Sequence, residues 1–231
     1  MPTALVTGAN RGIGAAIAET LAAGGYKLLL VARDEAQLNV VRERCEALGA
    51  NAEVAAGDLT EADFVAELEQ QVARRHGSID ALVNNAGIAL GGPVAQADVE
   101  AWRRLMDINF HAAVALTRAL LPAMLERGTG AVINVSSISG RHTDAGNTIY
   151  AASKHALNAF GGCLFEEVRD AGIKVSTIMP GFVATELTEG LGMDGEHMIA
   201  ASDVAEAVAY VLAASPRSCP TEIVLRPQRR P

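Results

Sequence analysis

The stretch that decides the fold of this chain is TALVTGANRGIGAAIAETLAA, residues 3–23. An apolar run leads directly into a glycine-rich turn at 7–14, and a helical pattern continues to about Ala23. Glycines tolerate positive φ and let backbone N–H groups approach a phosphate, while the N-terminus of the following helix carries partial positive charge. The order of strand, glycine turn and helix therefore predicts a site for a dinucleotide pyrophosphate, with a tight turn that binds nothing as the alternative.

Short apolar runs alternate with longer amphipathic stretches along the rest of the chain. The runs are 4–7, 27–32, 52–56, 79–84, 131–136, 174–179 and 222–226. The first six are separated by roughly ten to thirty residues, too many for hairpin turns and suited to the crossover helices of parallel strands. We therefore expect an α/β fold, a doubly wound parallel sheet of about seven strands with helices on both faces. No linker or repeat divides the sequence, so we expect one domain over residues 1–231.

Composition excludes several classes of function. A net charge of -8 at pH 7 argues against a nucleic-acid partner, because no basic surface is available to offset phosphate repulsion. The three cysteines have neither disulfide-framework nor metal-ligand spacing, so we expect no metal site and a reducing, cytoplasmic location. No signal peptide precedes the first run, and no run reaches about 18 uninterrupted apolar residues, so we expect no membrane association.

Tyr150 and Lys154 form a YxxxK pattern at the start of an alanine-rich helical stretch. Residues at i and i+4 share a helical face, so the phenol and the ammonium can point into one site. An unperturbed tyrosine has a pKa of about 10, and a nearby cation lowers that pKa. The spacing predicts that Tyr150 exchanges a proton with a substrate oxygen, with a half-buried Tyr150 and a solvated Lys154 as the alternative.

Further motifs stand at the ends of other apolar runs. Asn84-Asn85-Ala86-Gly87 closes the fourth run, Ser136-Ser137 closes the fifth, and Pro180-Gly181-Phe182-Val183-Ala184-Thr185 follows the sixth. Together with the TGxxxGIG turn and YxxxK, these motifs resemble those of the short-chain dehydrogenase/reductase family over residues 3–226. The resemblance implies a Rossmann-type sheet and hydride transfer between a nicotinamide cofactor and a carbonyl or alcohol.

The resemblance also implies a catalytic tetrad of Asn109, Ser137, Tyr150 and Lys154. Ser137 lies thirteen residues before Tyr150, which matches the spacing of the family's catalytic serine, whose hydroxyl holds the substrate oxygen. Asn109 matches the residue that positions a water near the lysine. The plainer alternatives are a turn-capping Ser137 and a solvent-facing Asn109.

Cofactor contacts follow from the same motifs. The residues that match the family's cofactor-binding positions are Gly8, Asn10, Arg11, Gly12, Ile13, Gly14, Arg33, Asp58, Leu59, Asn85, Ala86, Gly87, Tyr150, Lys154, Pro180, Gly181, Val183 and Thr185. Within this set, Asp58 resembles the residue that contacts the adenine amino group, and a helix-capping role is its alternative. The Thr185 hydroxyl and nearby backbone match the segment that holds the nicotinamide carboxamide.

The end of the second apolar run decides which nicotinamide cofactor is expected. General spacing rules select Asp34 as a ribose-binding acid, which favours NAD. In the family, however, the NAD-selecting acid stands at the position of Ala32 in this sequence, and Arg33 follows it. Without a carboxylate to repel it, a 2′-phosphate can be held by the Arg33 guanidinium, and Arg11 matches the family's basic NADP(H) pattern. We therefore expect NADP(H) to be preferred over NAD(H), although Arg33 could also be a solvated strand-end charge.

The substrate is expected to be a small or medium organic carbonyl or alcohol. A 3-oxoacyl-(acyl-carrier-protein) reductase is the enzymatic alternative, and a non-catalytic NADP(H)-binding regulator is the alternative from another class. The resemblance implies a homodimer or homotetramer formed through long helices near 99–126 and 150–170, and a substrate lid at about 186–201. Substrate identity and reaction direction do not follow from these motifs.

Overall fold

The computed structural model describes residues 1–189 and 194–231. Its strands are β1 (Thr3–Thr7), β2 (Lys27–Ala32), β3 (Ala52–Ala56), β4 (Ala81–Asn84), β5 (Gly130–Val135), β6 (Ile173–Pro180) and β7 (Glu222–Leu225). They pair in parallel in the order β3-β2-β1-β4-β5-β6-β7. Each predicted run is one of these strands, with ends within two residues of the expected bounds.

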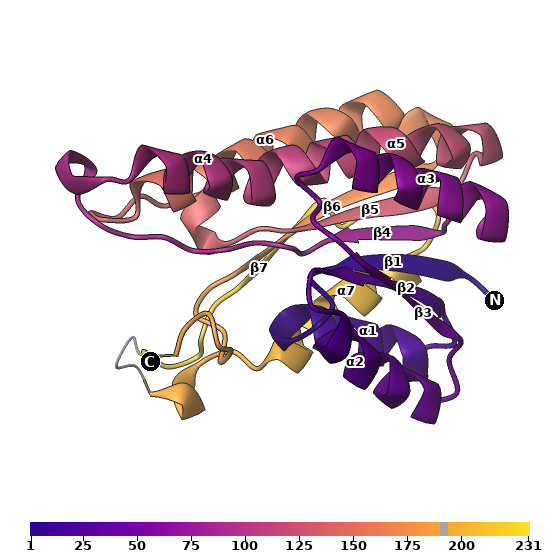
Figure 1. Cartoon of the computed structure of the whole chain (residues 1–231), viewed down its shortest axis with the longest axis horizontal. Coiled ribbons are helices and arrows are strands. Elements are labelled where there is room, and N and C mark those ends of the chain that lie inside the picture. Colours follow the sequence, from indigo (N-terminus) through magenta and orange to yellow (C-terminus); the bar gives the residue numbers. More distant parts are fainter. Residues whose placement is uncertain (190–193) are drawn as a thin grey trace.

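Helices cover both faces of the sheet (Figure 1). One face carries α1 (Gly12–Ala23), α2 (Glu35–Ala47) and α7 (Ala201–Ala213). The other carries α3 (Ala62–His76), α4 (Val99–Met106), α5 (Ala112–Arg127) and α6 (Thr148–Val168). The doubly wound Rossmann-type sheet is thereby confirmed.

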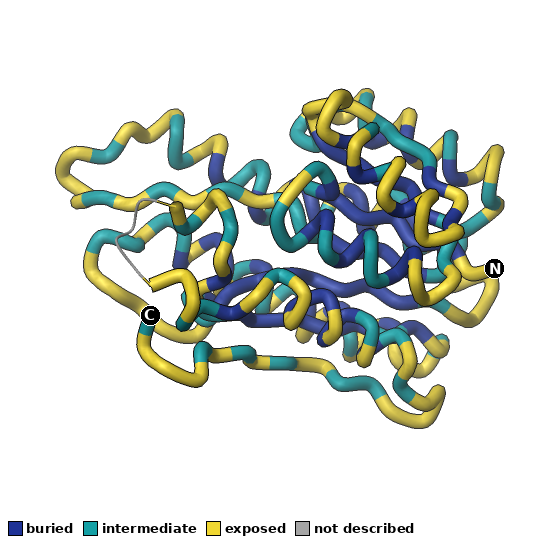
Figure 2. The backbone as a smooth tube through the Cα atoms, turned by 90° about the horizontal axis from the view of Figure 1, so that it is seen from below, coloured by how far each residue is buried: buried dark blue, intermediate teal, exposed yellow. Residues whose placement is uncertain are grey.

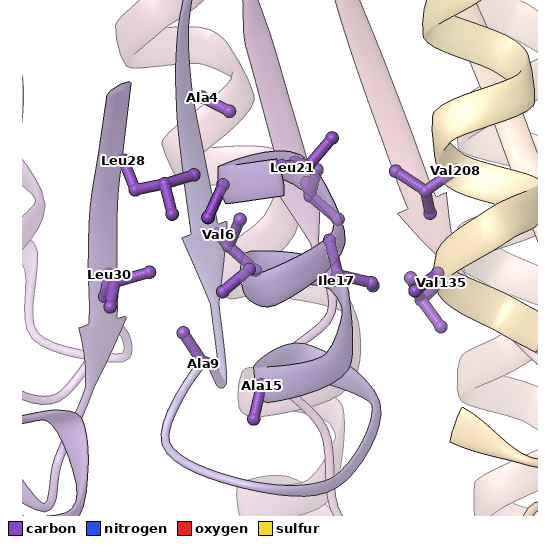
Figure 3. Close-up of a cluster of buried hydrophobic side chains, with 14 of the residues drawn as sticks. Ala4, Val6, Ala9, Ala15, Ile17, Leu21, Leu28, Leu30, Val135 and Val208 are labelled. Atoms are coloured by element: carbon purple, nitrogen blue, oxygen red, sulfur yellow. The ribbon is translucent and has the colours of Figure 1, made fainter. Parts of the chain in front are cut away.

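Burial explains why the strands are continuous apolar runs. Every residue of β1 and β4 is buried, because helices cover both faces of the central strands (Figure 2). The edge strands β3 and β7 are only partly buried. On the α1 face, Ile17 and Leu21 belong to one cluster with Val6, Leu28 and Leu30, and all five are at most 2% exposed (Figure 3).

The strand order positions the site. From β1 the chain continues to β2 and β3 on one side, and from β4 to β5, β6 and β7 on the other. Parallel strands end at the same edge of the sheet, and such sheets bind ligands outside the carboxyl ends where the order reverses. The segments after β1, β4, β5 and β6 therefore converge on one crevice.

The predicted long helix near 99–126 is present as one continuous helical stretch, Val99–Arg127. The π-helical turn Asp107–His111 separates α4 from α5. The stretch Val99–Arg127 is long and apolar enough to cross a membrane by length and composition, with a hydropathy of 1.3 in its most apolar window, of which 39% is buried. A core helix of a globular protein passes the same test, so this is weak support for a membrane span.

The predicted lid at 186–201 is described only in part. Residues 190–193 lie outside the described residues. A parallel bridge pairs Val183, just before this segment, with Ile199 near its end, and a short 3-10 helix spans Gly195–His197. The lid stays a prediction.

Candidate active site

The glycine turn after β1 has the backbone geometry that the sequence predicts. Gly8 and Gly12 have φ values of 62° and 52°, a region that side chains disfavour. A Cβ on Gly14 would lie 2.1 Å from the Gly8 carbonyl oxygen, so no other residue fits there without moving the backbone. The turn is thus held tightly against the N-terminus of α1, as a phosphate cradle requires.

Residues after β4 support the glycine turn. The Thr7 hydroxyl accepts hydrogen bonds from the backbone N–H groups of Asn85 (2.9 Å) and Ala86 (3.0 Å). Asn85 Nδ2 donates to the Thr7 carbonyl at 2.9 Å. A Cβ on Gly8 would lie 3.0 Å from Ala86 Cα. The glycine turn and Asn85-Ala86-Gly87 therefore pack directly against each other at the carboxyl edge of the sheet.

Asn84 holds secondary-structure elements together beneath the site. It is 4% exposed, and its Nδ2 donates to Thr117 Oγ1 at 3.1 Å and to Asn134 Oδ1 at 3.0 Å. Asn134 is the register partner of Asn84 on β5 and is fully buried. These contacts join β4, β5 and α5 beneath the crevice.

The end of β2 has the charges predicted to select the cofactor. The Asp34 carboxylate accepts a hydrogen bond from the Gln37 N–H at 3.0 Å and caps α2. Arg33 is exposed and forms no ion pair with any residue in 1–189 or 194–231. An open cavity of about 600 Å³ nearby is lined in part by Asn10, Arg11 and Gln37, but not by Arg33.

Asp58, the predicted adenine contact, belongs to an unpredicted cluster. Arg104 Nη2 on α4 lies 2.5 Å from Asp58 Oδ2, while the Thr60 N–H (3.0 Å) and hydroxyl (2.8 Å) donate to Oδ1. Burial raises the pKa of Asp58, but the hydrogen bonds from Thr60 and Arg104 outweigh burial and hold that pKa at about 2. Asp58 is therefore a fixed carboxylate, and Glu61 is the capping position of α3 instead.

Lys154 is buried at the centre of the candidate site. It is 4% exposed, and its Nζ donates to the Val135 carbonyl at 3.1 Å. The same Nζ lies 5.7 Å from the centroid of the Tyr150 ring. Burial lowers the pKa of Lys154 from 10.5 to about 8, so its ammonium can lose a proton near neutral pH.

Tyr150 and Ser137 interact across the gap between α6 and the end of β5. Burial raises the pKa of the Tyr150 phenol above its usual 10.0, and a hydrogen bond with Ser137 opposes this rise. We expected Lys154 to lower the pKa of Tyr150. In the chain itself, the pKa of Tyr150 is instead raised, because desolvation by burial is the largest influence. The Ser137 hydroxyl also accepts a hydrogen bond from the Ser139 N–H at 3.1 Å.

Asn109 lies in the π-helical turn between α4 and α5 and is 1% exposed, so it does not face solvent. Its Oδ1 accepts from the Ile88 N–H at 2.8 Å, and its Nδ2 donates to the Ile88 carbonyl at 2.9 Å. The Nδ2 also donates to Ser153 Oγ at 3.2 Å. A Cβ on Gly87 would lie 3.2 Å from Asn109 Oδ1 and 3.7 Å from Lys154 Nζ. Asn109 and Lys154 therefore approach the same backbone segment.

The segment after β6 reaches the glycine turn. The Gly181 N–H donates to the Leu225 carbonyl at 2.8 Å, which anchors the start of this segment to β7. A Cβ on Gly12 would lie 3.3 Å from Thr185 Cγ2 and 3.6 Å from a Glu186 carboxylate oxygen. The structure thus brings Thr185 against Gly12 of the glycine turn.

Three neighbours of the site escaped sequence reasoning: Arg104, Asn147 and Asn158. Arg104 contacts Asp58 from 46 positions away in the sequence, and no motif surrounds it. Asn147 and Asn158 flank the YxxxK pattern, and their amides bond to the turn that follows Ser137. Asparagine is an unfavourable residue inside a helix, so of these three residues only Asn158 could have been singled out from the sequence as having a specific role.

Metal ligands are absent from this arrangement in the part of the chain described. No group of three or more His, Cys, Asp or Glu side chains in residues 1–189 and 194–231 could hold a metal ion.

Comparisons with known proteins agree with the fold. Residues 2–195 match the family model described as short chain dehydrogenase. An uncharacterized oxidoreductase of Staphylococcus saprophyticus is 37% identical over 97% of this chain and 96% of its own length. A metagenomic short-chain oxidoreductase solved in complex with NADP is 35% identical, with a TM-score of 0.87 over 99% of this chain and 98% of that one. A variant of actinorhodin polyketide ketoreductase solved with NADPH is 30% identical, with a TM-score of 0.89 over 97% and 95% of the two chains.

Proposed function

Because this chain belongs to the short-chain dehydrogenase family, we propose that it transfers a hydride between NADP(H) and the carbonyl or alcohol of a small or medium organic substrate. The family relationship makes it an oxidoreductase that acts on CH–OH or C=O groups with NAD(P). The observation that carries the specific proposal is the convergence of Tyr150, Ser137 and Lys154 at the carboxyl end of β5.

Each member of this group has a distinct role in the proposal. Tyr150 donates a proton to the carbonyl oxygen during reduction, and its raised pKa keeps the phenol protonated at neutral pH. The Ser137 hydroxyl holds the same oxygen and stabilises the charge that develops on it. Lys154, with its pKa of about 8, passes a proton to the phenolate, and Asn109 fixes the loop at Ile88 beside Lys154.

The crevice suits a dinucleotide because the strand-to-helix turn at Gly8–Gly14 has space for no side chain at Gly14 and leads into the N-terminus of α1. In the proposal the glycine turn binds the pyrophosphate, Asp58 and Leu59 bind the adenine, and Asn85-Ala86-Gly87 lines the crevice floor. The backbone of Pro180, Gly181 and Val183 and the Thr185 hydroxyl hold the nicotinamide end. When bound, NADP(H) supplies or accepts the hydride.

Preference for NADP(H) over NAD(H) is proposed from the charges at the end of β2. Asp34 is engaged at the start of α2, whereas Arg33 is exposed and unpaired within the described residues. We expect Arg33→Ala to raise the Kd for NADPH by about 10- to 100-fold, since a charged hydrogen bond to phosphate contributes about 1.5–3 kcal/mol. The Kd for NADH should not change, and fluorescence titration measures both.

Arg42→Ala is the matched control, because Arg42 lies on the adjacent helix α2 and pairs with Glu46 instead. Its Kd for NADPH should equal that of the native protein. Equal affinity of the native protein for NADPH and NADH would contradict the proposed preference.

Turnover itself is tested by NADPH oxidation with ketones, aldehydes, sugars and a 3-oxoacyl thioester. The proposal expects turnover with at least one carbonyl class, because the proton donor and its partners are together. Turnover confined to the thioester would favour the 3-oxoacyl reductase alternative. Tight NADPH binding without turnover on any carbonyl would favour a regulator.

The oligomer and the location are also proposals. Only 39% of the most apolar window in Val99–Arg127 is buried in the single chain, which supports an interface in a homodimer or homotetramer. Light scattering on the purified protein measures the number of chains in the oligomer.

We also propose that the protein is cytoplasmic and forms one domain.

A further inference from the structure

Four polar side chains follow one face of α6 and its N-terminal cap. Asn147, Tyr150, Lys154 and Asn158 are spaced by three, four and four residues, which places them one above another on a helix. The two inner members belong to the proposed catalytic group. The two outer members have no part in the chemistry described so far.

Asn147 occupies the N-cap position of α6, where an asparagine side chain ordinarily accepts hydrogen bonds from the first turn. Within the described chain its side chain makes no such capping bond. Its Nδ2 donates instead to Ser139 Oγ at 3.1 Å. The amide of Asn147 is therefore directed at the turn that follows β5.

Asn158 bonds to the same turn from the other side. Its Nδ2 donates to the Gly140 carbonyl at 2.9 Å. A Cβ on Gly140 would lie 2.4 Å from Asn158 Nδ2 and 2.9 Å from the Lys154 carbonyl oxygen. The glycine lets the turn Ile138–Gly140 approach α6 closely, and the Asn158 amide satisfies a carbonyl in that contact.

The turn held in this way determines where the Ser137 hydroxyl points. Ser137 precedes the 3-10 turn Ile138–Gly140, and its Oγ accepts a hydrogen bond from the Ser139 N–H at 3.1 Å. With one lone pair of Oγ engaged by the backbone, the serine proton is available to the Tyr150 side of the site. If the turn shifted away from α6, Ser137 would move with it.

We propose that Asn147 and Asn158 form an asparagine clamp, a pair of positioning residues that hold the turn Ile138–Gly140 against α6 and keep Ser137 facing Tyr150. This inference rests on the proposed function, since it assigns the clamp to the same reaction. The clamp touches neither the substrate nor the hydride, and acts through Ser137.

The first test is a double-mutant cycle across the hydrogen bond between Asn147 and Ser139. Asn147→Ala and Ser139→Ala should each lower kcat by about 10-fold, because loss of the hydrogen bond lets the turn move and misplaces the Ser137 hydroxyl in the transition state. The double variant should be no slower than either single variant. The Kd for NADPH should stay at the native value, which a general loss of structure would not allow.

Thr148→Ala is the matched control, because Thr148 is an exposed neighbour of Asn147 in the first turn of α6 and has no place in the site. Its kcat should equal that of the native enzyme. Asn158→Ala should also lower kcat at an unchanged Kd for NADPH. If Asn158→Ala does not fold, the cycle between Asn147 and Ser139 decides the proposal alone.

Two results would overturn the clamp. One is native kcat in Asn147→Ala and Asn158→Ala, measured with the substrate that the native enzyme reduces. The other is strict additivity in the cycle, which would show that the hydrogen bond does not carry the effect. Failure of the clamp is distinguishable from failure of the proposed function. If the proposed function is wrong, the native protein does not turn over a carbonyl substrate, or Tyr150→Phe keeps its activity. If only the clamp is wrong, both of these proteins behave as expected.

Discussion

Tyr150→Phe is expected to lower kcat for carbonyl reduction by about 10²–10⁴-fold, the usual contribution of a positioned general acid. The substitution removes the phenolic oxygen alone and keeps the ring, so packing against Lys154 is retained. The Kd for NADPH should remain close to the native value. Steady-state kinetics with the best substrate from the carbonyl screen, together with fluorescence titration of NADPH, measures both quantities.

Tyr210→Phe provides the control for this experiment. Tyr210 is 63% exposed and lies on α7, which covers the opposite face of the sheet from α6. Its kcat should match that of the native enzyme. Substantial turnover in Tyr150→Phe, with the control active, would contradict proton transfer by Tyr150.

Lys154→Met is expected to separate activity from stability. Loss of the ammonium should lower kcat by at least about 10²-fold, because the proton path to Tyr150 is broken. The same change should raise the free energy of unfolding at pH 7. The pKa of Lys154 falls from 10.5 to about 8 on burial, so at neutral pH the folded state holds a charge that burial disfavours, and removing it stabilises by at most roughly 3 kcal/mol. Loss of the bond to the Val135 carbonyl offsets about 1 kcal/mol of this.

The pH dependence follows from the same shift. Between about pH 8 and 10.5 the unfolded chain keeps the Lys154 proton and the folded chain has lost it, so native stability rises with pH over this range. The advantage of Lys154→Met should therefore shrink from pH 8 to pH 10.5. Urea unfolding of both proteins measures the difference, from which groups common to both cancel. A constant advantage in Lys154→Met across this range would refute the assignment.

The fold could be predicted well because its strands are buried on both sides. Continuous apolar runs between helical stretches leave few arrangements open, and the glycine turn marks where the first strand ends. The π-helical turn between α4 and α5 could not be predicted, because 107–111 has no residue that sets it apart from the flanking helical pattern. This turn accompanies the hydrogen bonds of Asn109 with Ile88, which form only after the loop beyond β4 is in place.

The site could be predicted where its residues belong to motifs, and not where they meet through the fold. Tyr150 and Lys154 are one helical turn apart, and their proximity follows from spacing alone. The contact of Arg104 with Asp58 depends on how α4 lies against the loop that follows β3, and local sequence does not encode that arrangement. The direction of the Tyr150 pKa shift likewise depends on burial, which the YxxxK pattern does not reveal.

The buried pair of Asn84 and Asn134 has a consequence for how this sequence can diverge. One Nδ2 of Asn84 serves both Asn134 and Thr117, so three elements share a single polar junction. An apolar replacement of one partner would leave the others buried without it, at a cost of about 1–3 kcal/mol. Replacement of all three by apolar side chains of similar shape would avoid that cost. Single substitutions at this junction are therefore each destabilising. An all-apolar version of the junction is reached without that cost only when Asn84, Asn134 and Thr117 are replaced together.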